Sequence, residues 1–141
     1  MDHLAILDKK KPWLQKILAG EKTIESRWYR SRRAPWKQIQ KGDTIYFKNS
    51  GEAVTATAQV DDLIFIDHPT EKEIKSLLQQ YAEKICIPGE YRKEYQKYNY
   101  ITLLFLKNPQ EIEPFSINKS GYGSMAAWIS LEDIKQIKST R

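Results

Sequence analysis

Lys22, Glu25 and Arg27 are charged residues that lie close together near the start of the chain, in the stretch GEKTIESR at residues 20–27. Lys22 has an ammonium group that can donate to a phosphate or to the carbonyl of a base, and it becomes a general base if burial lowers its pKa. Glu25 can form a structural ion pair with Arg27, which is our preferred interpretation, or accept a hydrogen bond from the exocyclic amine of a base. A solvent-facing strand lysine is the alternative for Lys22.

A strongly basic segment follows at once. From Arg27 to Lys41 the chain has six Lys or Arg residues and no Asp or Glu, with aromatic residues among them. Cations beside flat rings suit a phosphate chain whose bases can stack. Trp36 is the better stacking candidate, because Trp28 alternates with Ile24 and is expected to be buried. The residues expected to contact phosphates are Arg27, Arg30, Arg32, Arg33 and Lys37.

The positive charge is concentrated in the first third of the chain. Residues 1–50 hold twelve Lys or Arg against five Asp or Glu, whereas the remaining 91 residues hold eleven against thirteen. A concentrated positive charge creates a local field that attracts anionic partners. The alternative is that these bases lie on scattered, solvated faces.

The length of 141 residues predicts a single domain, residues 1–141, with an ordinary buried core. The one cysteine cannot form an intrachain disulfide, and the two histidines lack the spacing of metal ligands, so we expect neither a metal nor a cofactor. The first residues resemble no secretory leader, and no apolar stretch approaches the length of a membrane span. We therefore expect a cytoplasmic monomer that does not contact membranes.

Hydrophobic periodicity predicts a mostly β chain with a few helices. Thr70 and Glu73 form a capping box at the start of the clearest helix, and Asp61 with Asp62 marks a bend or bulge in a long strand. The tyrosines after residue 90 are expected to cover the rim of the core, and GYGS at 121–124 to form a turn. The predicted strands are 3–7, 22–29, 44–48, 53–66 and 100–106; the predicted helices are 12–19, 70–85 and a short one within 131–138, capped by Ser130 with Asp133.

These elements predict a small barrel with two or three peripheral helices, in the α+β class. Regular alternation over residues 22–29 places Glu25 and Arg27 on one side of their strand. The same alternation places Lys22 and Trp28 on the other side. The basic loop leaves the end of this strand.

The stretch GEKTIESR resembles the signature of the ASCH domain (activating signal cointegrator homology), through Gly20, Lys22, Glu25 and Arg27. A short helix before the motif and a KGD turn into a strand after it fit the same layout. The resemblance implies a PUA-like fold, in which helices surround a cleft in a small β-barrel, with AAWI at 126–129 as a closing element. It also implies RNA binding or the recognition of a modified base.

Some ASCH proteins are enzymes, and the resemblance implies two hydrolase alternatives. One group cleaves N4-acetylcytidine with a Lys and a Thr of the motif, but Glu25 occupies the Thr position here, which disfavours that chemistry. Other members resemble ribonucleases that use Lys, Tyr and Ser side chains on single-stranded RNA. If the chain is an enzyme, the catalytic candidates are Lys22, Glu25, Tyr46, Lys48 and Ser124.

The sequence therefore predicts an RNA-binding ASCH domain that recognises single-stranded RNA, or a base within it, in a cleft lined by Lys22, Glu25 and Arg27. The loop from Arg30 to Lys37 is expected to contact the nucleic-acid backbone. A metal-independent hydrolase of RNA or of a modified nucleoside is the alternative. A third interpretation is a protein-interaction module whose basic face meets an acidic partner.

Overall fold

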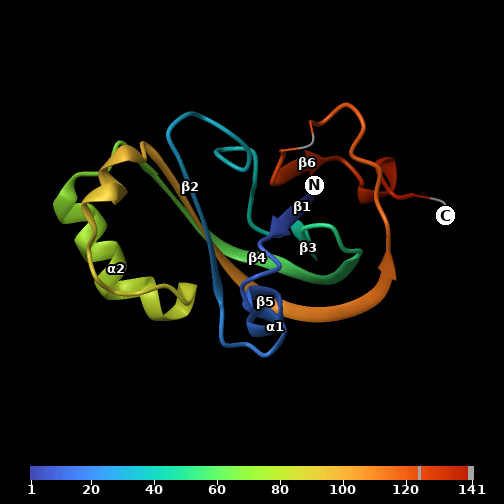
Figure 1. The fold of residues 1–141 in the computed structure, drawn as a ribbon, viewed down its shortest axis with the longest axis horizontal. Helices are drawn as coiled ribbons and strands as arrows, with labels where there is room; N and C mark the ends of the chain where they lie inside the picture. The colour runs from blue at the N-terminus through green and yellow to red at the C-terminus, as the bar shows by residue number, and fades with distance from the viewer. Residues whose placement is uncertain (124, 140–141) are drawn as a thin grey trace.

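A computed structural model describes residues 1–123 and 125–139, and six strands in it form one curled sheet, a half-barrel (Figure 1). The strand order across the sheet is β2-β5-β4-β3-β1-β6. Strands β1 and β3 run parallel, and the other neighbouring pairs run antiparallel. The bounds are β1 (Asp2–Leu7), β2 (Ile24–Tyr29), β3 (Thr44–Asn49), β4 (Val54–Asp67), β5 (Tyr100–Phe115) and β6 (Trp128–Leu131).

The two long strands β4 and β5 give the sheet its curl. Their pairing shifts register at three places, one of them between Val60 and Asp62, where the sequence predicts a bulge. Bulges bend a strand and increase its twist, so the pair turns from one end of the molecule to the other. Strand β5 is predicted to end at Leu106 but continues to Phe115. The added residues are mostly exposed and polar, so the apolar pattern that predicts a buried strand stops before the backbone pairing does.

Two of the three predicted helices form close to the predicted bounds. Helix α1 (Trp13–Leu18) lies between Pro12 and Gly20, and Gly20 has a φ of 78° that favours glycine. Helix α2 (Glu71–Ile85) begins with the predicted capping box at Thr70. The third, predicted within 131–138 with Ser130 and Asp133 as its cap, is only the short 3₁₀ helix η2 (Ile134–Gln136), because Leu131 ends β6 and the capping box joins Asp133 to Gln136.

Three apolar clusters fill the curled sheet. One lies under α2, which packs Ile74, Leu77 and Leu78 against the half of the sheet that carries β2 and the start of β5. A second joins α1 to β1, β3 and β4, and a third lies where β1 meets β6 and η2. Figure 1 shows α2 at one end of the molecule and β1, β3 and β6 at the other. The site described below lies where these two ends approach each other.

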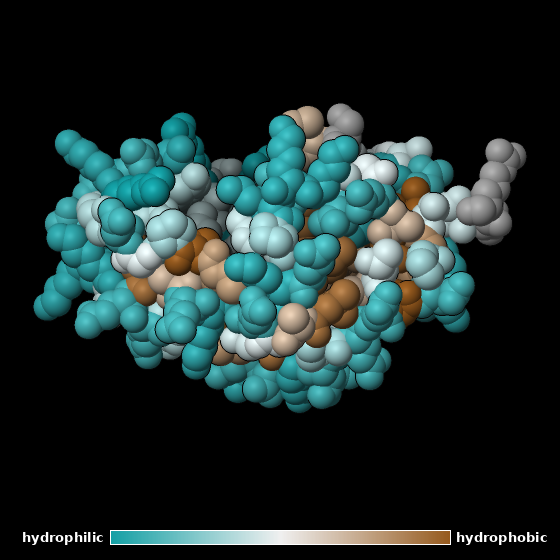
Figure 2. Space-filling model, turned by 60° about the horizontal axis from the view of Figure 1, so that its bottom comes forward, coloured by the Kyte–Doolittle hydropathy of each residue, from teal (hydrophilic) through white to brown (hydrophobic). Residues whose placement is uncertain are grey.

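The expected mostly β architecture with flanking helices is confirmed. The face drawn in Figure 2 is mainly hydrophilic, with apolar residues visible in the gaps between charged and polar side chains. Among the residues that the structure describes, no helix is both long and apolar enough to cross a membrane.

Candidate ligand pocket

A pocket of about 400 Å³ opens between the edge strand β2 and the end of β1. The end of α2 and the 3₁₀ helix η1 (Lys93–Lys97) complete its wall. Its volume falls within the range of about 300–1,000 Å³ that is typical of small-molecule sites. The residues that line it are Ile6, Leu7, Asp8, Trp13, Lys22, Glu25, Ser26, Arg27, Trp28, Tyr29, Ile85, Ile87, Tyr95, Tyr98 and Ala127.

Lys22 is buried in the wall of this pocket, with 2% of its surface exposed. Its Nζ donates a hydrogen bond to the carbonyl oxygen of Ile85, 2.6 Å away, at the last residue of α2. The same atom lies 3.7 Å from Oε1 of Glu25 and 5.4 Å from the centre of the Trp13 ring. Burial lowers the pKa of Lys22, and the neighbouring carboxylate of Glu25 only partly opposes that shift.

Glu25 and Arg27 form the polar part of the wall beside Lys22. Glu25 is 4% exposed; its Oε1 accepts from the backbone N–H of Ser26, and its Oε2 lies 3.5 Å from the Arg27 guanidinium. Arg27 also donates to the carbonyl oxygens of Ile6 and Ala127, each at 3.3 Å. These contacts support the preferred interpretation of Glu25 and Arg27 as a structural ion pair that holds the cleft wall.

Arg27 joins the two ends of the curled sheet. Strand β2 is one edge of that sheet, whereas Ile6 and Ala127 belong to β1 and to the segment before β6, at the opposite end of the strand order. The side chain of Arg27 is only 11% exposed. Its guanidinium bridges two carbonyl groups across the gap, and its predicted contact with a phosphate stays a prediction. The AAWI segment contributes Ala127 to the same wall, as its expected closing role implies.

The structure corrects the predicted placement of Lys22. Regular alternation puts Lys22 and Glu25 on opposite sides of a strand that begins at residue 22, but β2 begins at Ile24. Lys22 precedes the strand, and its side chain is free of the alternation. The two side chains therefore meet in the pocket.

The roles predicted for the two tryptophans are reversed. Trp28 is half-buried and lines the pocket, with ring centres 5.0 Å from Tyr95 and 6.0 Å from Tyr98. Trp36 is 7% exposed and packs against Phe65 and Tyr100, with ring centres 5.2 Å and 5.0 Å away. The prediction of Trp36 as an exposed stacking ring is wrong, because its loop folds back over the sheet.

Tyr95 and Tyr98 are pocket residues that the sequence analysis assigned only to the rim of the core. Tyr95 lies in η1, and Tyr98 is the residue that follows it. A spacing of three residues brings side chains to the same side of a 3₁₀ helix. That three-residue spacing is the one sequence signal that both tyrosines face the same side.

The basic loop continues from the end of β2, and none of residues 30–37 lines the pocket. Arg30, Arg32, Arg33 and Lys37 are all exposed. The Arg33 guanidinium lies 5.5 Å from the centre of the Tyr29 ring, and the Arg32 guanidinium lies 5.6 Å from that of Tyr100. Lys37 lies over Trp36 at 5.9 Å. All four cations are therefore accessible to an anionic ligand, and Arg33 lies over Tyr29, a residue that lines the pocket.

Tyr46 and Lys48, two of the residues proposed for ribonuclease chemistry, do not join Lys22 and Glu25 in the pocket. Tyr46 and Lys48 lie on one face of β3, and neither lines the pocket. Burial raises the pKa of Tyr46 and lowers that of Lys48. Lys48 pairs with Ile6 of β1, and Ile6 lines the pocket. Strand β1 therefore lies between Lys48 and the pocket. Ser124 lies outside the described residues.

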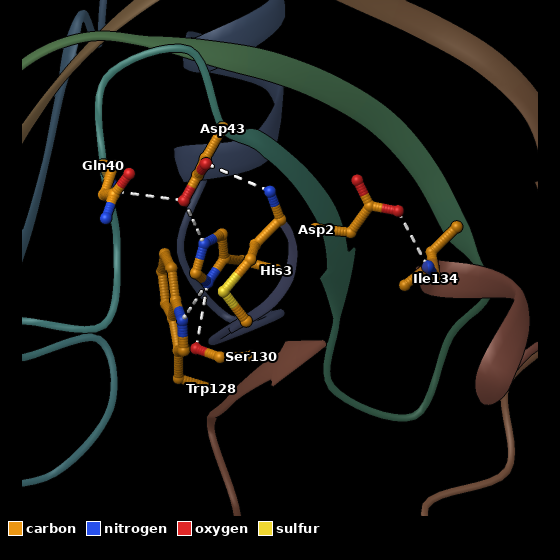
Figure 3. Close-up of polar contacts among 8 residues, drawn as sticks. Asp2, His3, Gln40, Asp43, Trp128, Ser130 and Ile134 are labelled. Atoms are coloured by element: carbon orange, nitrogen blue, oxygen red, sulfur yellow. Dashed lines mark hydrogen bonds and ion pairs between the residues drawn. The ribbon is translucent and has the colours of Figure 1, made fainter. Parts of the chain in front are cut away.

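A buried polar cluster, which the sequence analysis missed, supports the wall behind Arg27 (Figure 3). The Arg27 guanidinium lies 5.1 Å from the centre of the Trp128 ring, and Nε1 of Trp128 donates to Nδ1 of His3 at 3.3 Å. Ser130 Oγ lies 2.9 Å from the same nitrogen. Because an indole N–H can only donate, Nδ1 of His3 is an acceptor and Nε2 carries the hydrogen.

The other side of His3 is held by Asp43. Nε2 of His3 donates to Oδ2 of Asp43 at 2.8 Å, and Asp43 also accepts from the backbone N–H of Gln40 and from the amino group of Met1. Burial lowers the pKa of His3 more than its carboxylate partner raises it. Burial by itself raises the pKa of Asp43, but the hydrogen bonds from His3, Gln40 and Met1 outweigh it and lower that pKa.

The fold and the pocket together define a small, mostly β domain of PUA-like architecture. The chain belongs to the ASCH domain family, whose model matches residues 7–116. The predicted family is therefore confirmed. No curated protein matches the chain.

Solved structures show the same fold. The crystal structure of ASCH from Zymomonas mobilis is similar with a TM-score of 0.65 at 16% identity, and the alignment covers 98% of this chain and 96% of that one. A mutant of the same Zymomonas mobilis protein gives a TM-score of 0.66 at 17% identity, covering 96% of this chain and 91% of that one. At such low identity the likeness concerns the fold.

Proposed function

We propose that this ASCH domain binds single-stranded nucleic acid, in the first instance RNA, and receives one unpaired base in the pocket beside Lys22. The observation that carries the proposal is the pairing of a buried polar wall with an aromatic one in a pocket of about 400 Å³. Unstacked bases are recognised by stacking on aromatic rings and by hydrogen bonds to their polar edges. The pocket offers both kinds of contact.

The polar wall keeps free donor and acceptor capacity. Lys22 has three N–H donors; one goes to the carbonyl oxygen of Ile85, and a second faces Glu25 across 3.7 Å. Glu25 has about four acceptor positions, and Ser26, Arg27 and Lys22 face three of them. A donor beside an acceptor matches the edge of a base that carries both a carbonyl and an amine. The pocket is thereby suited to read a base edge.

The aromatic wall and the loop supply the affinity. Trp28 faces the pocket together with Tyr95 and Tyr98, so a base has a flat surface on which to stack. The exposed cations of the loop extend from the end of the same strand. Among them, Arg30 and Arg33 lie beside Trp28 and Tyr29 of the pocket wall, which supports a contact with a phosphate next to the inserted base.

Fluorescence anisotropy at low salt, with labelled single-stranded RNA, single-stranded DNA and duplex, tests the proposal. We expect Trp28→Ala to weaken single-strand binding by roughly 5- to 150-fold, since stacking contributes about 1–3 kcal/mol per base. Trp36→Phe is the matched control and should bind as the wild type does, because its ring lies outside the pocket. Failure of the wild type to bind any of these probes would overturn the proposal.

A metal-independent hydrolase is the second candidate, and the lowered pKa of the buried Lys22 favours it. A lysine whose pKa is lowered gives up its own proton more readily, and its neutral amine can then take a proton from water or from a hydroxyl group. Incubation with N4-acylated cytidine and with labelled RNA, both in chelator, separates the two functions. Turnover that disappears in Lys22→Ala and persists in Arg32→Ala supports catalysis, and the absence of turnover leaves the binding function.

A further inference from the structure

A second hollow shares a wall with the pocket beside Lys22, which we call the base pocket. It has a volume of about 470 Å³, and three of its residues, Trp28, Tyr29 and Tyr98, also line the pocket beside Lys22. The two spaces are therefore neighbours across a single aromatic wall. We call this second space the anion hollow, since its remaining side chains include three cations and no carboxylate: Arg30, Arg33 and Lys97.

The shared aromatic wall positions two of these cations. The Arg33 guanidinium lies 5.5 Å from the centre of the Tyr29 ring, and Nζ of Lys97 lies 5.1 Å from the centre of the Tyr98 ring. Cation–π contacts of this kind hold a cation without neutralising its charge. Both cations are thus kept at the border of the base pocket with their charge available.

Arg30 is held by the backbone. The side-chain amide of Asn99 donates to the carbonyl oxygen of Arg30 at 2.8 Å, and the backbone N–H of Asn99 donates to that of Tyr29 at 2.9 Å. These bonds fix the end of β2 against the residue before β5. Within the described chain, no carboxylate lies within 4.0 Å of the charged groups of Arg30, Arg33 or Lys97.

The other loop cations are placed differently. Arg32 lies over Tyr100 and Lys37 lies over Trp36, and neither lines the base pocket or the anion hollow. Arg32 and Lys37 contribute to the general field, as Arg33 and Lys97 do, but not to the border between the two spaces. The pair Arg33 and Lys97 and the pair Arg32 and Lys37 therefore carry the same charge but lie at different places.

We propose that the anion hollow holds the phosphate group attached to the nucleotide whose base occupies the pocket. This inference rests on the proposed function and deepens it, because it makes the preferred ligand a phosphorylated nucleotide and not a free nucleoside. A guanidinium pairs with phosphate in a bidentate way, and an ammonium adds a point charge. The adjacency of the two spaces matches the adjacency of base and phosphate in one nucleotide.

Isothermal titration of the full chain at low salt tests this inference, with the four common nucleosides, their 3′- and 5′-monophosphates and inorganic phosphate as probes. We expect at least one monophosphate to bind about tenfold or more tightly than its nucleoside. The choice between the 3′ and 5′ series shows on which side of the sugar the phosphate lies. The double variant Arg33→Ala/Lys97→Ala should lose this advantage, and the charge-matched Arg32→Ala/Lys37→Ala should keep it.

The failures of the two proposals are distinguishable. Equal affinity for nucleosides and monophosphates, or an equal loss in both double variants, overturns the phosphate site and leaves the base pocket intact. Binding of inorganic phosphate that depends on Arg33 and Lys97, without binding of any nucleoside or strand, overturns the base pocket and with it the adjacency proposed here. Absence of binding by every probe overturns both.

Discussion

The ammonium group of Lys22 and the carbonyl oxygen of Ile85 lie 2.6 Å apart, so the first cation of the family motif also satisfies the last residue of helix α2. The C-terminal end of a helix carries partial negative charge and leaves carbonyl groups without helical partners. Lys22 supplies a donor and a positive charge at that point. The candidate site and the core under α2 therefore depend on the same side chain.

This shared role predicts energetic coupling between Lys22 and Glu25. We expect Lys22→Met and Glu25→Gln each to lower the free energy of unfolding by about 1–3 kcal/mol, because each leaves a buried polar group without a partner. The double variant should cost less than the sum of the two, by about 0.5–3 kcal/mol. Urea unfolding measures all four proteins.

The ion pair between Lys41 and Asp62 is the control for this cycle. Both side chains are more than half exposed, and the two charged groups lie 3.4 Å apart. Exposed pairs show little coupling, so Lys41→Met and Asp62→Asn should be additive. Additive effects at Lys22 and Glu25 as well would contradict a shared buried pair.

The two tryptophans should separate stability from binding. Trp36→Ala should lower the free energy of unfolding by about 3–5 kcal/mol, because the ring is buried against Phe65 and Tyr100. Trp28→Ala should change stability less and binding more, because the ring is half-buried and faces the pocket. Thermal unfolding together with anisotropy checks both. A large loss of binding only in the Trp36 variant would reverse the assignment.

The His3 cluster predicts that stability falls as the pH drops below neutrality. The folded protein lowers the pKa of His3 from its ordinary value of 6.5, so the unfolded chain binds more protons between those two values. The stability from neutral His3 is complete above about pH 6.5 and is lost as the pH falls through the folded pKa. Asp43 acts at lower pH, because its pKa is lowered from 3.8.

Denaturant unfolding between about pH 5 and 7.5 measures this effect. The variant His3→Gln replaces the imidazole with a side-chain amide, which can still donate and accept hydrogen bonds but gains no proton in this range. Its free energy of unfolding should therefore depend less on pH than that of the wild type. An unchanged dependence would mean that groups other than His3 cause it.

Salt should weaken the binding of single-stranded nucleic acid, because the loop arginines are expected to contact its phosphates. Each phosphate neutralised on a single strand lowers log K by roughly 0.7 per decade of salt. The triple variant Arg30→Ala/Arg32→Ala/Arg33→Ala should therefore reduce the slope by about 2 if each arginine meets one phosphate. The triple variant of Lys9, Lys10 and Lys11 to Ala removes the same charge from outside the loop. Equal flattening in both would point to a diffuse field and not to loop contacts.

The sequence predicts most elements here because their signals are local. The capping box at Thr70, the helix end at Gly20 and the bulge near Asp62 each depend on a few adjacent residues. The motif residues Lys22 and Glu25, which the sequence analysis expects in a cleft, both line the pocket, and their role there stays a prediction. The contact between their two side chains is not predicted, because the alternation of sides applies only within β2, and Lys22 precedes its first residue.

The missed features depend on contacts between residues far apart in the chain. His3 meets Trp128 across 125 positions, and Arg27 meets Ala127 across 100. The first pair forms because β1 and β6 are neighbouring strands, and the second forms because the sheet curls and brings β2 toward β1. No local sequence pattern encodes either contact. Trp28 was expected to be buried because alternation pairs it with Ile24, but β2 is an edge strand and leaves the ring half-buried at the pocket.

The most direct test of the base pocket follows the four indole N–H signals by NMR while a short single-stranded RNA is added. Trp28 lies in the pocket wall and Trp36 lies outside it. We expect the Trp28 signal to shift strongly and saturably, while the Trp36 signal stays in place. Saturable binding that leaves the Trp28 signal unchanged would contradict the insertion of a base into this pocket.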